Sequence, residues 1–198
     1  IIYEEETTIH STNGWYNTKT ELSQLLDRSR IIHTDGITLT GDTIYYDKQK
    51  GYGHCIGNIE SVDSTNQMTL YGHLGEVWED GNRAYVTDSA MMVEWSDSAN
   101  YTYMHADTLW TEEIPYQTYS LLMKDSVMVD SVWQYPAPDT LWQDTTYLQV
   151  RAYYNVRIFR EDVQAVCDSV HYNVLDSIAT LCGDPVCWNE DNQVSADT

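Results

Sequence analysis

The chain has 198 residues, with 31 Asp or Glu against 10 Lys or Arg, so its formal net charge at pH 7 is −21. This balance argues against nucleic acid as a partner and disfavours direct binding to an anionic membrane surface, since both need clustered Lys and Arg. No run of 18 apolar residues is present, so no helical segment is predicted to span a bilayer.

The composition favours β structure with one solvated face. The chain contains 16 Tyr and 7 Trp but 1 Phe, and Thr, Val and Ile are plentiful. Its length suits one domain with a continuous core, which we place over residues 1–198. Because the pattern is already under way at Ile1 and restarts at Asp197, we expect a piece of a longer protein whose leader has been removed.

The first 35 residues are the least regular part of the chain. Leu22, Leu25 and Leu26 would form one stripe on a helix, but they also fit a strand and a turn. We favour the strand, because residues 30–33 fit the later strand pattern and Asp35-Gly36 is a turn signal.

A short pattern then recurs: a small residue, usually Asp, then Ser or Thr, then an apolar pair. It starts at Gly41 and returns in modified form at Tyr71, Ala106, Cys167 and Ala196. The spacing is roughly 30 residues, or twice that across one interruption, which is typical of repeat proteins. We interpret each occurrence as a corner that leads into a strand, and we expect two to three short strands per repeat.

A second set of bends lies between these corners. Gly57-Asn58, Asp88-Ser89, Tyr154-Asn155 and Asp184-Pro185 hold equivalent places in successive copies. Small and turn-forming residues at such places let a strand bend.

The third copy is interrupted over residues 111–147. This segment holds three of the four prolines, Pro115, Pro136 and Pro138, and has an alternating run of its own from Val127 to Val132. We interpret it as an insertion that forms a hairpin or a long loop on one face, since insertions into repeat arrays fall in loops.

Alternation of apolar and polar residues predicts which side chains face the interior of the stacked repeats. The predicted interior positions are Ile44, Tyr46, Ile59, Val77, Ala90, Met92, Leu109, Val156, Ile158, Val170, Tyr172 and Val186. The two ends of such a stack are exposed strand edges, which can pair with another copy or another protein.

The four cysteines match no zinc-binding spacing. Cys182 and Cys187 are close enough in sequence to be bridged across a turn in an oxidising compartment. The interpretation that we favour is that they are small buried apolar residues within strands.

Known catalytic and metal-binding motifs are absent from the sequence. The sequence has no nucleophile elbow, no phosphate-binding glycine loop and no His-Glu-x-x-His, so we expect no enzyme and no cofactor. His73 and His105 lie near successive corners, but surface histidines are favoured over a metal site. The repeated Asp residues could line up to bind calcium; hydrogen bonding to their own turns is the favoured alternative.

Several motifs resemble the OstA/LptA family of periplasmic lipopolysaccharide-transport proteins, including the longer OstA-like proteins of the Bacteroidetes type. The similar segments are residues 39–47, 51–53, 57–59, 152–158, 164–172 and 184–188. The resemblance implies an all-β fold, a repeat-built β-jellyroll whose folded-over antiparallel sheet is open along one side. It also implies that the interior holds acyl chains of lipopolysaccharide and that the ends join neighbouring proteins.

Two functions therefore compete at this stage. The first is a non-catalytic periplasmic lipid-binding module, with the predicted interior residues around the acyl chains and lipopolysaccharide and other jellyroll proteins as partners. The alternative is a structural module whose own side chains fill the interior and which assembles edge to edge. The insertion and the charge of −21 both depart from the compact family pattern.

Overall fold

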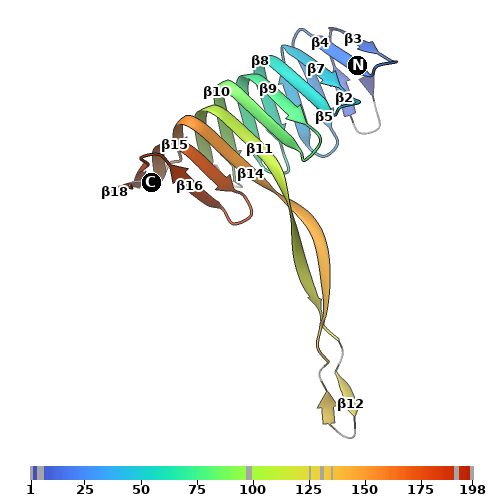
Figure 1. Cartoon of the computed structure of the whole chain (residues 1–198), viewed down its shortest axis with the longest axis vertical. Helices are drawn as coiled ribbons and strands as arrows, with labels where there is room; N and C mark the ends of the chain where they lie inside the picture. Colours follow the sequence, from blue (N-terminus) through green and yellow to red (C-terminus); the bar gives the residue numbers. More distant parts are fainter. Residues whose placement is uncertain are drawn as a thin grey trace.

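The computed structural model describes residues 2–3, 7–96, 100–124, 126–129, 132–134, 136–189 and 192–196, and every element in these ranges is a β-strand. The described segments include no helix long and apolar enough to cross a membrane. Sixteen strands form one antiparallel sheet, and two more pair by themselves. The chain is therefore all-β (Figure 1).

The strands before the first long one are short. They are β1 (Ile2–Tyr3), β2 (Thr7–His10), β3 (Asn13–Asn17), β4 (Leu22–Leu26), β5 (Ser29–His33), β6 (Ile37–Gly41) and β7 (Thr43–Asp47). The strand interpretation of the leucine-containing segment is confirmed by β4, and the helix alternative is wrong.

The middle of the chain forms six long strands. They are β8 (Tyr52–Asp63), β9 (Met68–Trp78), β10 (Arg83–Trp95), β11 (Tyr101–Leu122), β14 (Asp139–Phe159) and β15 (Val163–Asn173). The chain closes with three short strands, β16 (Ile178–Cys182), β17 (Val186–Asn189) and β18 (Asn192–Ser195).

The sheet folds over itself into two layers. Layer A contains β3, β4, β7 and β16, whereas layer B contains β1, β2, β5, β6, β17 and β18. Each long strand belongs to both layers, because β8 pairs with β7 in layer A and with β6 in layer B, and β15 likewise pairs with β16 and β17. Figure 1 shows the strands arching from one layer to the other along the body.

The long strands cross from one layer to the other at the corners and bends predicted from the sequence. The pairing register shifts between Ile56 and Ile59 in β8, between Thr87 and Ala90 in β10, and at the corresponding places in β11 and β14. The expectation of several short strands per repeat is therefore wrong for the long strands. A β-bulge bends a strand without ending its pairing on either side.

The bend in β8, at Gly57 and Asn58, shows why the strand changes direction there. Gly57 has φ of +83°, and a Cβ there would lie 2.6 Å from a carboxylate oxygen of Asp42. Asn58 follows with φ of +45° and donates a hydrogen bond of 2.6 Å to the same Asp42 side chain. Gly and Asn tolerate this left-handed region better than other residues do.

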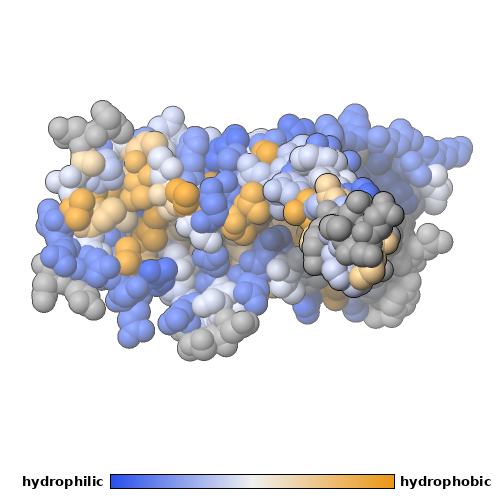
Figure 2. Space-filling model, turned by 90° about the horizontal axis from the view of Figure 1, so that it is seen from below, coloured by the Kyte–Doolittle hydropathy of each residue, from blue (hydrophilic) through white to orange (hydrophobic). Residues whose placement is uncertain are grey.

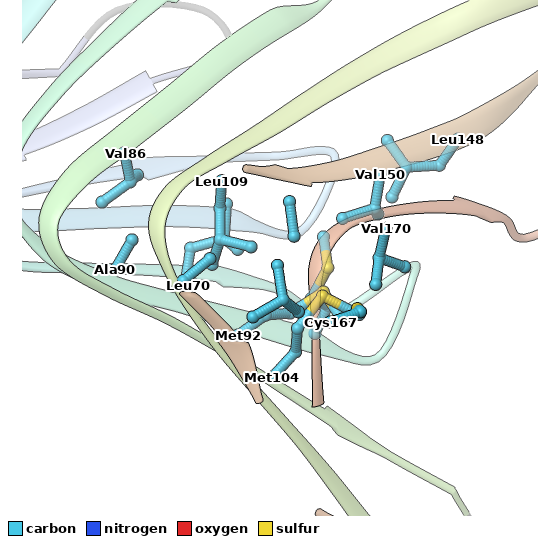
Figure 3. Packing of buried hydrophobic residues seen from close by; sticks show 14 residues of the cluster. Leu70, Val86, Ala90, Met92, Met104, Leu109, Leu148, Val150, Cys167 and Val170 are labelled. Carbon is cyan, nitrogen blue, oxygen red and sulfur yellow. The ribbon is translucent and has the colours of Figure 1, made fainter. Parts of the chain in front are cut away.

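Buried apolar side chains lie between the layers in two clusters. The larger one draws its residues from β9, β10, β11, β14 and β15, and Figure 3 shows Met92 and Leu109 among them. The smaller one consists of Leu25, Ile44, Cys55 and Ile59 near the N-terminal end.

The strands β11 and β14 continue beyond the body as a two-stranded hairpin (Figure 1). Their pairing runs without a break from Ile114 and Tyr147 to Leu122 and Asp139. The separate pair β12 (Val127–Val129) and β13 (Val132–Gln134) lies farther along the same segment.

Candidate functional site

The candidate site is the inner surface between the two layers. In layer A, strand pairing places one row of inward side chains side by side across neighbouring strands. The row consists of Tyr46, Gly53, Val77, Ala84, Thr111, Val150 and Tyr172. Directly paired residues point to the same face of a sheet, so these residues share one environment unless the opposite layer changes it.

The exposure along this row changes. Val77 in β9 is 37 % exposed, whereas Val150 in β14 is 1 % exposed and Thr111 beside it is 6 % exposed. The same inward row is therefore open to solvent near β9 and closed near β14.

Layer B shows the same trend. Its inward row contains Leu39, Ser61, Leu70, Met92, Met104 and Ile158. Leu39 in β6 and Ser61 in β8 are half-buried, whereas Leu70 in β9 and the next two residues of the row, Met92 and Met104, are buried. We call the body around β2–β9 the N-terminal section and the body around β10, β11, β14 and β15 the central section.

Tyr46 and Tyr172, the two tyrosines in the inward row of layer A, make different contacts. The Tyr172 hydroxyl donates a hydrogen bond of 3.2 Å to Glu94 in layer B, so it links the layers in the central section. Burial, and secondarily the nearby Glu94 carboxylate, raises the pKa of Tyr172. The Tyr46 hydroxyl instead donates to Glu79, which lies just beyond β9 at the edge of its own layer.

The open side of the fold exposes apolar surface. In Figure 2, seen from the side on which the hairpin projects, a discontinuous apolar band runs along the body between hydrophilic borders. At the C-terminal end, Leu175, Ile178 and Val194 are more than half exposed.

Most side chains predicted for the interior lie between the layers. Those that are 4 % exposed or less are Ile44, Ile59, Ala90, Met92, Leu109, Val156 and Val170. Ile158 and Tyr172 are partly buried against the larger cluster, and Tyr46 is half-buried. The structure thus brings these residues together on the inner face.

Two positions differ from the prediction. Val77 lies on the inner face but is exposed, because its neighbours Gly53 and Ala84 are small. Val186 pairs with Val166, which is 37 % exposed, whereas Cys187 pairs with the buried Ala165. Cys187 rather than Val186 therefore shares the inner face, one residue away from the prediction.

Sequence reasoning missed other inward residues. Cys55, Met68, Leu70, Val86, Met104 and Val150 are buried, and the alternation around each gave a usable signal. The contact between Glu94 and Tyr172 had no such signal, because 78 residues separate the two.

The described residues contain no group of three or more His, Cys, Asp or Glu that could hold a metal ion. All four cysteines are free thiols, with Cys55 and Cys167 buried and Cys182 and Cys187 half-buried. Burial raises the pKa of Cys55 to about 12 and that of Cys167 to about 11, so neither is a ready thiolate nucleophile.

A recess of about 590 Å³ lies outside the corners, lined by Arg28, Asn58, His73 and their neighbours. The positively charged guanidinium of Arg28 in this recess already has hydrogen-bond partners. It donates to the carbonyl oxygen of Asn58 at 2.7 Å and to the carboxylate of Asp42 at 3.4 Å. The inner face is therefore a better candidate for a binding site than this recess.

Comparison with known proteins bears on the fold. No protein-family model matches the sequence, and no curated protein sequence does. Among solved structures, the chain is similar to LptH from Pseudomonas aeruginosa, the LptA-homologous periplasmic component of the lipopolysaccharide transport device. The TM-score is 0.50 at 10 % identity, over 74 % of this chain and 82 % of that chain. The fold is thus an LptA-like β-jellyroll, a folded-over antiparallel sheet.

Proposed function

We propose that this chain is a non-catalytic periplasmic lipid-binding module that takes part in lipopolysaccharide transport to the outer membrane. The observation that carries the proposal is the likeness of its folded-over sheet to LptH. An apolar inner face that reaches the solvent near Val77 supports it.

The acyl chains bind first in the N-terminal section. Its inner face offers Tyr46 and Val77 in layer A and the partly buried Ile9, Ile31 and Leu39 in layer B. Each methylene that leaves water there contributes about 0.8 kcal/mol. The predicted positions in the central section, such as Met92 and Val156, contact lipid only when the layers separate, because they are packed together.

The phosphorylated head group stays in water outside the fold. A protein with a net charge of −21 repels phosphate groups, so the driving force is burial of the chains.

The ends of the body join other jellyroll proteins or further copies of this chain. The outermost strands are β1 and β3 at one end and β16 and β18 at the other. Exposed backbone groups on such strands accept an added strand, and the exposed Ile178 and Val194 add apolar surface at the C-terminal end.

A matched pair of photoreactive substitutions tests the lipid site. Tyr46 and Tyr45 are neighbours, but Tyr46 shares the inner face with Gly53, whereas Tyr45 packs on His54 with ring centroids 5.3 Å apart on the other face. With p-benzoylphenylalanine at each position in turn, we expect lipopolysaccharide to cross-link at position 46 and not at position 45. Equal labelling at both positions, or none at either, contradicts the proposal.

A structural module without lipid is the second candidate. The observation that favours it is the packed central section, where Met92, Val150 and Val156 are each 1 % exposed. Native mass spectrometry separates the two functions, because a self-filled module retains no lipid after purification while it still assembles end to end.

A further inference from the structure

The hairpin that projects from the body has no place in the proposed lipid site. We call residues 114–147 the arm. Its strands pair with each other from Ile114 and Tyr147 to Leu122 and Asp139, and no third strand pairs with this part in the described chain. A lone two-stranded ribbon is marginally stable in water, so an arm of this length needs something to bind.

The arm exposes large apolar side chains in unusual number. Eight of them are at least 55 % exposed: Tyr119, Leu121, Leu122, Met123, Met128, Trp133, Leu141 and Trp142. Soluble proteins rarely expose such a group of apolar residues unless it binds a protein or a membrane.

The exposed residues lie on both faces of the arm. Tyr119 and Trp142 form a direct pair on one face, with ring centroids 5.3 Å apart, and Leu121 shares that face. Leu122 and Leu141 lie on the opposite face, by the alternation of side chains along each strand. A groove on a partner protein covers one face of a ribbon, whereas the boundary of a bilayer surrounds an inserted ribbon on all sides.

The residue types fit the boundary between lipid head groups and acyl chains. Trp and Tyr are enriched at this level of a bilayer, where an aromatic ring meets both water and hydrocarbon. The unpaired backbone edges of the arm need water or another hydrogen-bonding partner, so only the end of the arm enters and the ribbon does not cross the membrane.

The length of the arm removes the charge objection raised by the composition. Residues 114–147 contain four Asp and one Lys, so all but three of the 21 net negative charges lie outside the arm. Lys124 is paired with Asp139 at 2.6 Å. The paired stretch from Ile114 to Leu122 spans about 26 Å at ~3.3 Å per residue, against a screening length of about 8 Å in physiological salt. The acidic body therefore stands beyond the range of strong repulsion by anionic lipids.

We propose that the arm docks the protein onto a phospholipid bilayer, with Met123, Met128 and Trp133 at its far end inserted between head groups and acyl chains. The open side of the body, from which the arm projects, then faces the membrane (Figure 2). This docking does not depend on lipid binding between the layers.

Flotation of the full chain with vesicles of phosphatidylethanolamine and a minor fraction of phosphatidylglycerol tests the proposal. The double variant Met128→Asp, Trp133→Asp should partition onto the vesicles at least about tenfold more weakly, because binding scales with the apolar area inserted. The matched control is Tyr154→Asp, Phe159→Asp in β14, which removes two side chains that are 61 % and 52 % exposed on the body and adds the same charge. The control should bind as the wild type does.

Three results of the flotation would overturn the docking. They are a wild-type protein that does not float, a double variant that binds as well as the wild type, and a control that loses as much binding as the arm variant. A double variant that alters only self-association, measured by sedimentation without vesicles, also overturns it in favour of an interface between copies. Cross-linking of lipopolysaccharide at position 46 should persist in the double variant, so this proposal and the proposed function fail separately.

Discussion

Val77 and Val150 occupy the same inward row of layer A, yet one is 37 % exposed and the other 1 % exposed. The N-terminal and central sections differ in what surrounds these two valines. Gly53 and Ala84 flank Val77, whereas Thr111 and Tyr172 flank Val150. The size of the neighbouring side chains therefore decides how far each of these two valines is exposed to solvent.

Connectivity strengthens this difference. In the central section β10, β11, β14 and β15 each run through both layers, so one continuous strand ties the layers together at every crossing. In the N-terminal section β8 and β9 also run through both layers, but β3, β4 and β7 belong to one layer and β2, β5 and β6 to the other. Layers that share fewer continuous strands can separate at lower cost, which suits a site that must admit a ligand.

The largest effect that we expect comes from shortening the two valines. Val150→Ala should lower the free energy of unfolding by about 2–3 kcal/mol, because it removes buried methyl groups and leaves a cavity. Val77→Ala should cost about 1 kcal/mol or less, since its side chain is already in contact with solvent. Urea unfolding measures both, and equal losses would mean that the two sections are packed alike.

The corners were predictable from the sequence, and the closure of the fold was not. Gly57-Asn58 carries a local signal, because both residues adopt the left-handed backbone region. Gly41 carries another, because a Cβ there would lie 2.1 Å from the sulfur of Cys55. Whether pairing continues through a corner depends on the neighbouring strands, so the length of β8 could not be derived from its own residues. In the last repeat the left-handed residues are Gly183 and Asp184, one position before the predicted bend at Asp184-Pro185, which moves the inner position from Val186 to Cys187.

Whether each part of the inner face is packed or open to solvent could not be predicted from the sequence either. Burial of Met92 depends on side chains of the opposite layer, and alternation along one strand reports only which face a residue takes. The contact of Glu94 with Tyr172 closes the central section through residues that no local pattern connects.

Removal of this contact should have the next largest effect. Tyr172→Phe should destabilise the protein by about 1 kcal/mol, because a part-buried hydrogen bond between the layers is lost while the ring remains. Tyr46→Phe, in the same inward row of layer A, should destabilise the protein less, since the hydrogen bond of Tyr46 to Glu79 is exposed. Thermal unfolding gives the comparison, and hydrogen exchange should speed up in β14 and β15 only for Tyr172→Phe. A larger loss for Tyr46→Phe would contradict the assignment of the layer contact to the central section.

The smallest effect concerns the buried thiol of the N-terminal cluster. Burial raises the pKa of Cys55 from 9.0 to about 12, so the folded thiol stays protonated where the unfolded one ionises. Its contribution to stability is complete below pH 9, declines as the pH rises above 9, and levels off near pH 12 once the folded thiol also ionises. By pH 10 the loss amounts to about 1 kcal/mol. Urea unfolding at pH 8 and pH 10 under reducing conditions should therefore show a smaller pH dependence in Cys55→Ala than in the wild type. Val150→Ala serves as the control for lost packing, because it removes no titratable group and should leave the pH dependence unchanged. If Cys55→Ala had the same pH dependence of stability as the wild type, solvent would have to reach the small cluster. The N-terminal section would then be open to solvent as far as Cys55.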